Sequence, residues 1–346
     1  MKSKILELLR STNEYVSGQE ICEKFGVSRT AVWKAVESLK KDGYVIEAVR
    51  NRGYKLEDTG VDIFNKRELC RALNGNGLIS KAEFFEEIGS TNTEAKRLAD
   101  EGEDEGLLLV ADRQLSGRGR RGRDWISPSG KNVYYTLMLK PGILPNKAPM
   151  LTLVMALSVA SAIEDLRKEA EGAKETSGVC KKQNDDLPKV SIKWPNDILI
   201  GGKKVCGILT EMSAENDYIH YVVIGVGINV KLQHFDKEIK DKATSIDEAF
   251  GSATNRCNLV GRIIAYFEKH YKAFLENEDL SLLKAEYESF LINKDKEVKI
   301  LDPKGEYVAR AIGINDIGEL TVKKENGEII QVYAGEVSVR GIYGYT

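Results

Sequence analysis

The sequence predicts an α+β protein in three parts: an N-terminal winged helix-turn-helix (residues 1–65), a central mixed α/β sheet domain (66–293) and a small SH3-like β-barrel (294–346). Three observations predict this arrangement. Apolar residues recur at helical spacing near the N-terminus, strand-like runs alternate with helices in the middle, and short alternating runs with Gly-containing turns close the chain. A length of 346 residues suits two or three domains of roughly 100 to 200 residues each.

The composition is that of a globular protein, with 42% hydrophobic and 30% charged residues and a net charge of −2. Residues 1–56 are basic, with 11 Lys and Arg against 7 Asp and Glu. Five scattered cysteines without a CxxC pair, and only three histidines, indicate reduced thiols in the cytoplasm and no metal site. The most apolar run, residues 150–163, is shorter than the roughly 20 residues that cross a bilayer. It therefore predicts a buried helix and no membrane segment.

Residues 1–43 have the pattern of three helices. Apolar residues at positions 5, 6, 8 and 9 form the stripe of a first helix. Ser17 and Glu20 match a capping box at the start of the second helix. Ser28 is expected to cap the third helix, which Gly43 ends. Two helices joined by a three-residue turn predict a helix-turn-helix.

A hairpin over residues 44–56 completes a winged helix-turn-helix, because its alternating strands turn at Asn51-Arg52-Gly53. Basic side chains on the third helix and on this wing favour DNA binding. A packing module that touches no DNA is the alternative. The expected DNA contacts are Gln19, Ser28, Arg29, Thr30, Trp33, Lys34, Arg50 and Arg52.

From residue 66 the pattern changes to strands mixed with helices, which predicts an α+β domain. We expect helices over 66–73, 148–170 and 256–293, a strand, turn and helix over 82–102, and strands over 106–114, 131–141, 190–200, 202–213 and 218–230. Residues 168–189 are polar and low in apolar content, so we expect a flexible surface loop there.

The segment SGRGRRGRDW, Ser116–Trp125, places four arginines and three glycines between two predicted strands. Such a segment suits either a nucleic-acid arm or a loop that closes over a small phosphorylated ligand. Four further polar segments lie at strand ends: GSTNTEAK (89–96), KWPND (193–197), KVCGIL (204–209) and GVGIN (225–229). Taken by itself, each segment has a plain structural explanation, such as helix capping by Ser90 or Thr91. A lone GxG is weak evidence of a nucleotide-binding site.

Taken together, these five segments resemble the biotin protein ligases, in the family's order and at plausible separations. With the winged helix, essentially the whole chain is similar to the bifunctional members of that family, which also repress the biotin operon. Lipoate ligases share the fold but lack the arginine loop. The segment 168–189 is longer than the family needs, and its role is open.

The resemblance implies a two-step reaction in which biotin and MgATP give biotinyl-5′-adenylate, which then acylates a lysine of a biotin-acceptor domain. It implies catalytic roles for Lys204, Arg118 and Arg120. It implies biotin contacts from Ser90, Thr91, Asn92, Gln114, Arg118, Gly119, Arg120, Lys204, Gly207, Leu209, Gly225 and Gly227. ATP contacts are expected from Arg121, Arg123, Trp125, Asn196, Asp197 and Asn229, with Asn196 and Asp197 as candidates for phosphate or Mg²⁺.

The residue types suit that chemistry. A carboxylate and a phosphate repel each other, and fixed arginines in a dry site reduce the repulsion. Glycines between them let the loop act as a lid that excludes water from a hydrolysable mixed anhydride. These arguments favour the small ligand over a nucleic-acid arm for the loop. Trp125 is alternatively part of the core, and Lys193 ranks below Lys204 because Lys204 begins the more apolar strand.

The family also implies that the adenylate is a corepressor that promotes a homodimer on operator DNA. Three hypotheses follow: a ligase that is also a repressor, a ligase whose N-terminal module binds no DNA, and a ligand-responsive transcription factor without enzyme activity.

Overall fold

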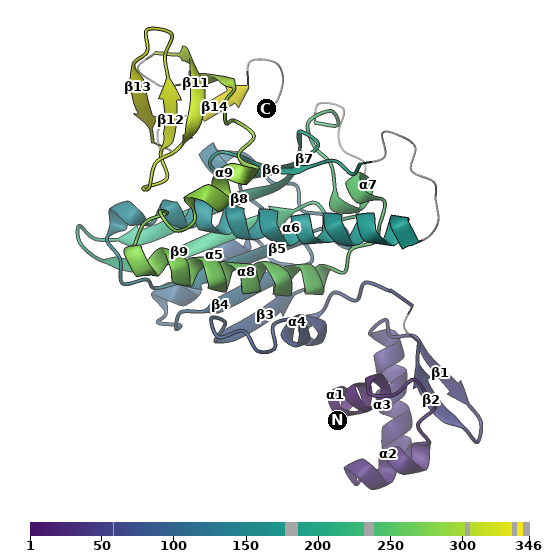
Figure 1. The fold of residues 1–346 in the computed structure, drawn as a ribbon. Helices are drawn as coiled ribbons and strands as arrows, with labels where there is room; N and C mark the ends of the chain where they lie inside the picture. The colour runs from purple at the N-terminus through teal and green to yellow at the C-terminus, as the bar shows by residue number, and fades with distance from the viewer. Residues whose placement is uncertain (58, 177–185, 232–238, 302–304, 334–337, 342–346) are drawn as a thin grey trace. The chain divides into compact units, whose positions relative to one another are not determined.

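The structure, a computed structural model, describes residues 1–57, 59–176, 186–231, 239–301, 305–333 and 338–341 (Figure 1). Contacts between residues divide the chain into two compact units, Met1–Glu68 and Leu69–Thr346. The strands of the C-terminal sheet lie within the second unit. The α+β fold class is confirmed, whereas the domain boundaries after residues 65 and 293 stay predictions.

The N-terminal unit is a helix-turn-helix with a two-stranded wing. Ser17 and Ser28 cap their helices, because each hydroxyl accepts a hydrogen bond from a backbone N–H three residues on. The wing turns through Asn51 and Gly53, both at positive φ. Apolar side chains from the three helices and the wing share one core. The elements are α1 (Lys2–Arg10), α2 (Gly18–Phe25), α3 (Arg29–Lys41), β1 (Ile46–Val49) and β2 (Gly53–Leu56).

The described residues of the second unit form a seven-stranded mixed sheet in the order β3-β4-β5-β9-β8-β7-β6. β3 and β4 are parallel, and the other neighbours are antiparallel. The strands are β3 (Lys81–Phe85), β4 (Leu107–Ala111), β5 (Val133–Leu139), β6 (Val190–Lys193), β7 (Asp197–Ile200), β8 (Lys203–Ala214) and β9 (Ile219–Ile228). Residues 190–200, expected as one strand, are thus two antiparallel strands joined at Trp194–Asn196.

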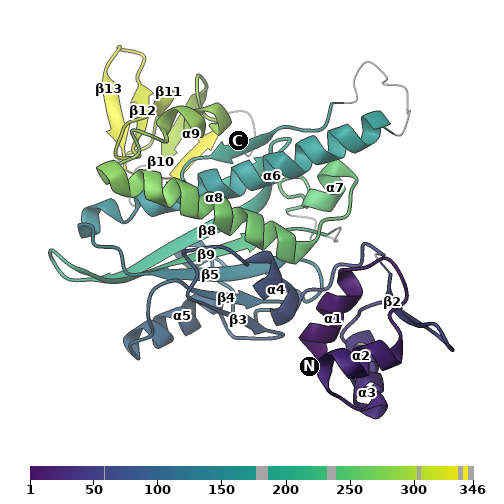
Figure 2. The same cartoon turned by 60° about the horizontal axis from the view of Figure 1, so that its bottom comes forward.

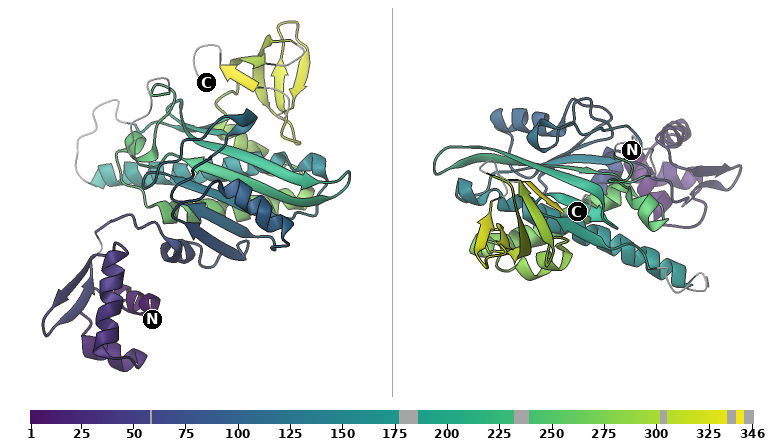
Figure 3. Two further views of the ribbon diagram at one scale, coloured as in Figure 1. Left: turned by 180° about the vertical axis from the view of Figure 1, so that it is seen from behind. Right: turned by 90° about the horizontal axis from the view of Figure 1, so that it is seen from above.

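Helices cover both faces of this sheet. Figures 1 and 2 show α6 (Met150–Thr176) and α8 (Arg256–Asn277) side by side on one face. Figure 3 shows α5 (Thr91–Asp100) on the opposite face, where Ala95 and Ala99 pack on Leu107 and Val223. The remaining helices are α4 (Lys66–Ala72), α7 (Ile246–Phe250), α9 (Lys284–Phe290) and the 3₁₀ turns η1 (Arg120–Gly122) and η2 (Pro145–Lys147).

The α6 helix corrects one expectation. The expected helix was to end at residue 170, but residues 171–176, expected in a loop, extend α6 to Thr176. Ion pairs one turn apart support this part of the helix: Arg167 pairs with Glu164 at 2.7 Å and with Glu171. Residues 177–185 lie outside the described residues. Within the described chain, one helical segment, Pro145–Ala173, is apolar enough to span a membrane, but 72% of its window is buried, as in a core helix.

The C-terminal part is a small antiparallel sheet. Its described strands follow the order β13-β12-β11-β10-β14. They are β10 (Glu297–Leu301), β11 (Tyr307–Ile314), β12 (Leu320–Lys323), β13 (Ile329–Val332) and β14 (Ser338–Gly341). A Gly-containing turn at Glu325-Asn326-Gly327 joins β12 to β13.

Trp194 ties this sheet to the central one. Its ring is 2% exposed, and its Nε1 donates a hydrogen bond to the Gly318 carbonyl at 3.0 Å. Its backbone N–H donates to Asn293 Oδ1 at 3.1 Å. A tryptophan in a motif expected to carry chemistry is therefore a structural anchor.

We predict that Trp194→Phe destabilises the second unit by about 2–4 kcal/mol, because it removes ring volume and leaves a buried carbonyl without its donor. Calorimetric unfolding of the full chain would measure the change. The matched control is Trp33→Phe, because Trp33 is 55% exposed and should shift stability by no more than about 0.5 kcal/mol. Equal effects at the two sites would contradict the anchoring role.

Candidate functional site

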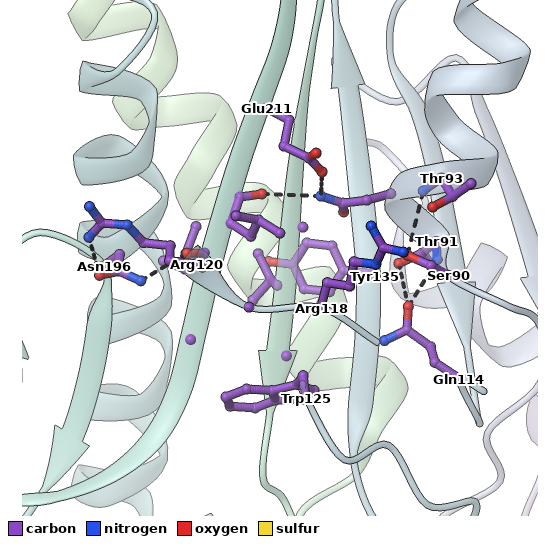
Figure 4. Close-up of a pocket in the computed structure, with 18 of the residues that line it drawn as sticks. Ser90, Thr91, Thr93, Gln114, Arg118, Arg120, Trp125, Tyr135, Asn196 and Glu211 are labelled. Carbon is purple, nitrogen blue, oxygen red and sulfur yellow. Dashed lines mark hydrogen bonds between the residues drawn. The ribbon is translucent and has the colours of Figure 1, made fainter. Parts of the chain in front are cut away.

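A pocket opens on the sheet face that carries α5, above β8 and β9 (Figure 4). The register of the two strands pairs Gly207 with Gly227 and Leu209 with Gly225. Because side chains alternate along a strand, these positions share one face. Three of the four are glycines, so the sheet has a strip without side chains here.

Neighbouring side chains fill part of that strip closely. A Cβ atom on Gly225 would lie 2.1 Å from Asn92 Oδ1, and one on Gly227 would lie 2.5 Å from Trp125 Nε1. Neither contact is possible, so any larger residue at these positions would displace Asn92 or Trp125. The glycines are required by close approach and not by backbone conformation, because neither has a positive φ.

One wall of the pocket is a chain of hydrogen bonds at the start of α5. Ser90 caps the helix. Thr91 donates to Gln114 Oε1 from its backbone N at 2.9 Å, and its Oγ1 lies 3.1 Å from the same oxygen. Thr136 donates to Asn92 Oδ1 at 2.6 Å. Polar atoms of known orientation thus line this wall.

The opposite end of the pocket carries Lys204. Its Nζ donates to Asp197 Oδ1 at 2.5 Å and lies 5.4 Å from the centroid of the Trp125 ring. Trp125 Nε1 is buried and has no hydrogen-bond partner among the described residues. A buried donor without a partner is costly, so this end of the pocket suits a ligand that offers an acceptor.

The arginine loop is folded against the pocket. The Gly119 N–H donates to the Arg123 carbonyl at 2.7 Å, and the Trp125 N–H donates to the Gly117 carbonyl at 2.9 Å. Arg120 Nη1 donates to Asn196 Oδ1 at 2.9 Å. Burial lowers the pKa of Arg120 from its ordinary value, although the charge of Asp197 opposes this.

A buried ion pair holds the base of the loop. Arg256, at the start of α8, is 4% exposed and donates to Asp112 Oδ1 at 2.7 Å. Asp112 also accepts from the Gly130 N–H at 3.1 Å and from the Ser129 hydroxyl. One carboxylate therefore clamps the residues that precede and follow the loop, which narrows the conformations open to it.

The pocket gathers every residue that was expected to contact biotin. Trp125 and Asn196 also line it. The other expected ATP contacts lie outside its lining: Arg121 and Arg123 are exposed, Asp197 reaches it only through Lys204, and Asn229 Nδ2 donates to the Thr244 carbonyl at 3.2 Å. Sequence reasoning missed six lining residues: Thr93, Lys96, Tyr135, Ile208, Glu211 and Val226. Strand alternation from Gly207 and Leu209 was the signal that could have found Glu211.

The expected DNA contacts are solvent-exposed, as a DNA-binding face requires. Arg29 donates to Gln19 Oε1 at 3.0 Å, which links α3 to α2. Arg52 lies over the Tyr15 ring, 4.3 Å from its centroid, which steadies the wing. The exposed residues are Gln19, Ser28, Arg29, Thr30, Trp33, Lys34, Arg50 and Arg52.

Three family models match separate segments of the chain. The model of the biotin/lipoate A/B protein ligase family matches residues 84–229. An HTH domain model matches residues 2–55, and the biotin protein ligase C-terminal domain matches residues 295–340.

Individual relatives belong to the same family as these domain models indicate. The bifunctional ligase/repressor BirA of Bacillus subtilis is 36% identical over 98% of both chains. That of Escherichia coli is 27% identical over 97% of this chain and 96% of its own length. A solved structure of the biotin protein ligase from Aquifex aeolicus, in complex with biotin and ATP, is 30% identical with a TM-score of 0.63. It covers 76% of this chain and all of that chain. The expected resemblance is confirmed, and this chain belongs to the bifunctional ligase/repressor family of biotin protein ligases.

Proposed function

We propose that this protein attaches biotin to a lysine of an acceptor domain in two steps. In the first, the biotin carboxylate attacks the α-phosphorus of ATP, which forms biotinyl-5′-AMP and releases pyrophosphate. In the second, the acceptor lysine attacks the acyl carbon, which forms an amide and releases AMP. The observation that supports this most is that one pocket collects all the residues expected to contact biotin.

Charge supports the first step. Arg118, Arg120 and Lys204 line the pocket, and cations so placed reduce the repulsion between a carboxylate and a phosphate. The ion pair with Asp197 fixes the position of the Lys204 ammonium. In our proposal Lys204 contacts the biotin carboxylate and then the acyl oxygen, where negative charge develops in both steps.

The glycine strip supports biotin as the ligand. Gly207, Gly225 and Gly227 let Trp125 and Asn92 lie directly against the sheet, which keeps the space above these two side chains free for flat fused rings. The polar wall from Ser90 to Gln114 supplies donors and acceptors for a cyclic urea. The loop that carries Arg118 and Arg120 then covers the adenylate and excludes water.

Magnesium belongs in this proposal as the counter-ion of ATP, without protein ligands of its own. Asn196 Oδ1 already accepts from Arg120, and Asp197 Oδ1 already accepts from Lys204. Oxygens that face cations do not fit a metal site, so we derive no step through the metal. Asn196 positions Arg120 in this account.

The exposed face of α3 and the basic wing support a second role, in which the adenylate-bound protein forms a homodimer on operator DNA in the cytoplasm. A dimer would present two winged helices to the two halves of a palindrome. The alternative is a ligase whose N-terminal module binds no DNA.

We predict that incubation of the protein with biotin, MgATP and an acceptor domain yields biotinylated acceptor, which mass spectrometry would detect.

We expect Lys204→Ala to lower biotinyl-AMP formation roughly 100-fold or more, the scale of one lost transition-state donor. Lys203→Ala is the matched control, since Lys203 is exposed outside the pocket lining and should keep full activity. Near-normal adenylate synthesis by Lys204→Ala would remove this lysine from the mechanism.

We predict that the full chain with biotin and ATP shifts DNA from its own biotin-operon promoter in a gel. Arg29→Ala should weaken this binding roughly 5- to 150-fold, the scale of one lost contact to a base. Binding that survives an excess of unrelated DNA is the specificity control. A promoter fragment that never shifts, although the same preparation biotinylates its acceptor, would favour the ligase without DNA binding.

A further inference from the structure

One ion pair in the pocket has no part in the function proposed above. Glu211 on β8 and Lys96 on α5 both line the pocket, and Lys96 Nζ lies 2.8 Å from Glu211 Oε1. Among the described lining residues, Glu211 is the sole carboxylate. A negative charge is unexpected in a pocket that is proposed to bind two anions, the biotin carboxylate and the ATP phosphates.

The pair lies at the end of the pocket away from Lys204. Along β8 the pocket face runs from Gly207 through Leu209 to Glu211. At about 3.3 Å per residue, four residues span roughly 13 Å. Lys204 is therefore well separated from Glu211, whose carboxylate is balanced by its ion pair with Lys96 and by the nearby charge of Arg118.

Glu211 is also the first member of a hydrogen-bonded chain, and Figure 4 shows the first bond of that chain at the Glu211 carboxylate. Asn92 Nδ2 donates to Glu211 Oε2 at 2.8 Å, and Asn92 Oδ1 accepts from Thr136 at 2.6 Å. Thr136 Oγ1 lies 2.8 Å from Thr91 Oγ1. The side-chain relay ends at Thr91, whose hydroxyl donates to Thr136; separately, the Thr91 backbone N–H donates to Gln114 Oε1 at 2.9 Å, and Gln114 Nε2 donates to Ser127 Oγ at 3.3 Å.

A carboxylate sets the direction of such a chain because an ionised carboxylate only accepts hydrogen bonds. Burial opposes the ionisation of Glu211, but hydrogen bonds from Lys96 and Asn92 outweigh burial and lower its pKa. Asn92 must then present its NH₂ group to Glu211, which turns its Oδ1 toward Thr136.

We propose that Glu211 and Lys96 are a positioning pair for biotin, which fixes the amide orientation of Asn92 and, through Asn92, the hydroxyl directions of Thr136 and Thr91. The inference rests on the proposed function, because it assigns these groups to biotin recognition. The pair acts through Asn92 and touches neither reacting atom. It explains why a neutralised carboxylate lies in a pocket for anions.

The test is a set of variants at the two positions. In Glu211→Gln, Lys96 attracts the new amide oxygen, so the new NH₂ group faces the NH₂ of Asn92. The side-chain amide of Asn92 then rotates so that its oxygen faces residue 211, and its NH₂ group donates to Thr136, which reverses the donor and acceptor roles along the chain. In Glu211→Gln/Lys96→Met, the new oxygen is free to turn toward Asn92, which restores the original direction.

We expect Glu211→Gln to raise the KM for biotin roughly 10-fold or more, with the KM for ATP at saturating biotin unchanged. The double variant should recover most of that loss. Pyrophosphate release by the full chain gives both constants. Glu94→Gln is the matched control and should behave as wild type. Glu94 lies on α5, the helix that carries Lys96, but it pairs with Arg97 outside the pocket.

Three results would overturn the positioning role: a biotin KM for Glu211→Gln within twofold of wild type, an equal rise in both KM values, or a double variant no better than the single one. Wild-type protein that forms no biotinyl-AMP would instead overturn the proposed function itself, so the two failures are distinguishable.

Discussion

The pocket depends on one constraint, which is the lack of side chains at register-matched positions of β8 and β9. Gly207, Gly225 and Gly227 clear a strip of sheet in the middle of an apolar core, where strands otherwise carry packed side chains. Trp125 and Asn92 approach that strip so closely that a single methyl group would collide with them. Every polar contact of the site is built around this strip, so the backbone defines the site before any charged residue does.

The arginine loop is held from several directions, although its glycines make it pliable. Arg256 and Asp112 clamp its base, and Asn196 holds Arg120 near its tip. Asn196 in turn donates to the Ile208 carbonyl at 3.0 Å on β8. Two residues earlier, Trp194 is bonded to the C-terminal sheet. The short segment from Trp194 to Asn196 therefore joins the C-terminal sheet, the pocket strand and the loop, which gives the last fifty residues a physical link to the site.

Sequence reasoning identified the elements well where local signals were strong. Helix caps at Ser17 and Ser28, the Asn51 turn and the buried α6 are all local features of pattern and turn chemistry. It was wrong on residues 171–176, because their low apolar content was taken to indicate a loop, although Ala, Glu and Lys favour helices and Arg167 pairs with its neighbours along the helix. The family resemblance named residues that the fold brings together in one pocket, but spacing within an irregular loop does not say which way Arg121 and Arg123 point. Lys96 and Glu211 are 115 residues apart, and each alone looks like a surface charge.

The distribution of charge in the pocket argues for a ligand with two unlike ends. Lys204 and Arg120 carry positive charge at one end, while at the other end Glu211 pairs with Lys96, feels the charge of Arg118 and lies beside directed hydrogen-bonding groups. A ligand that is apolar at its far end would cover this polar wall without offering it any hydrogen bond, at a desolvation cost. Biotin has one carboxylate and one neutral polar ring, and it satisfies both ends, whereas a fatty acyl or dithiolane tail satisfies only the first.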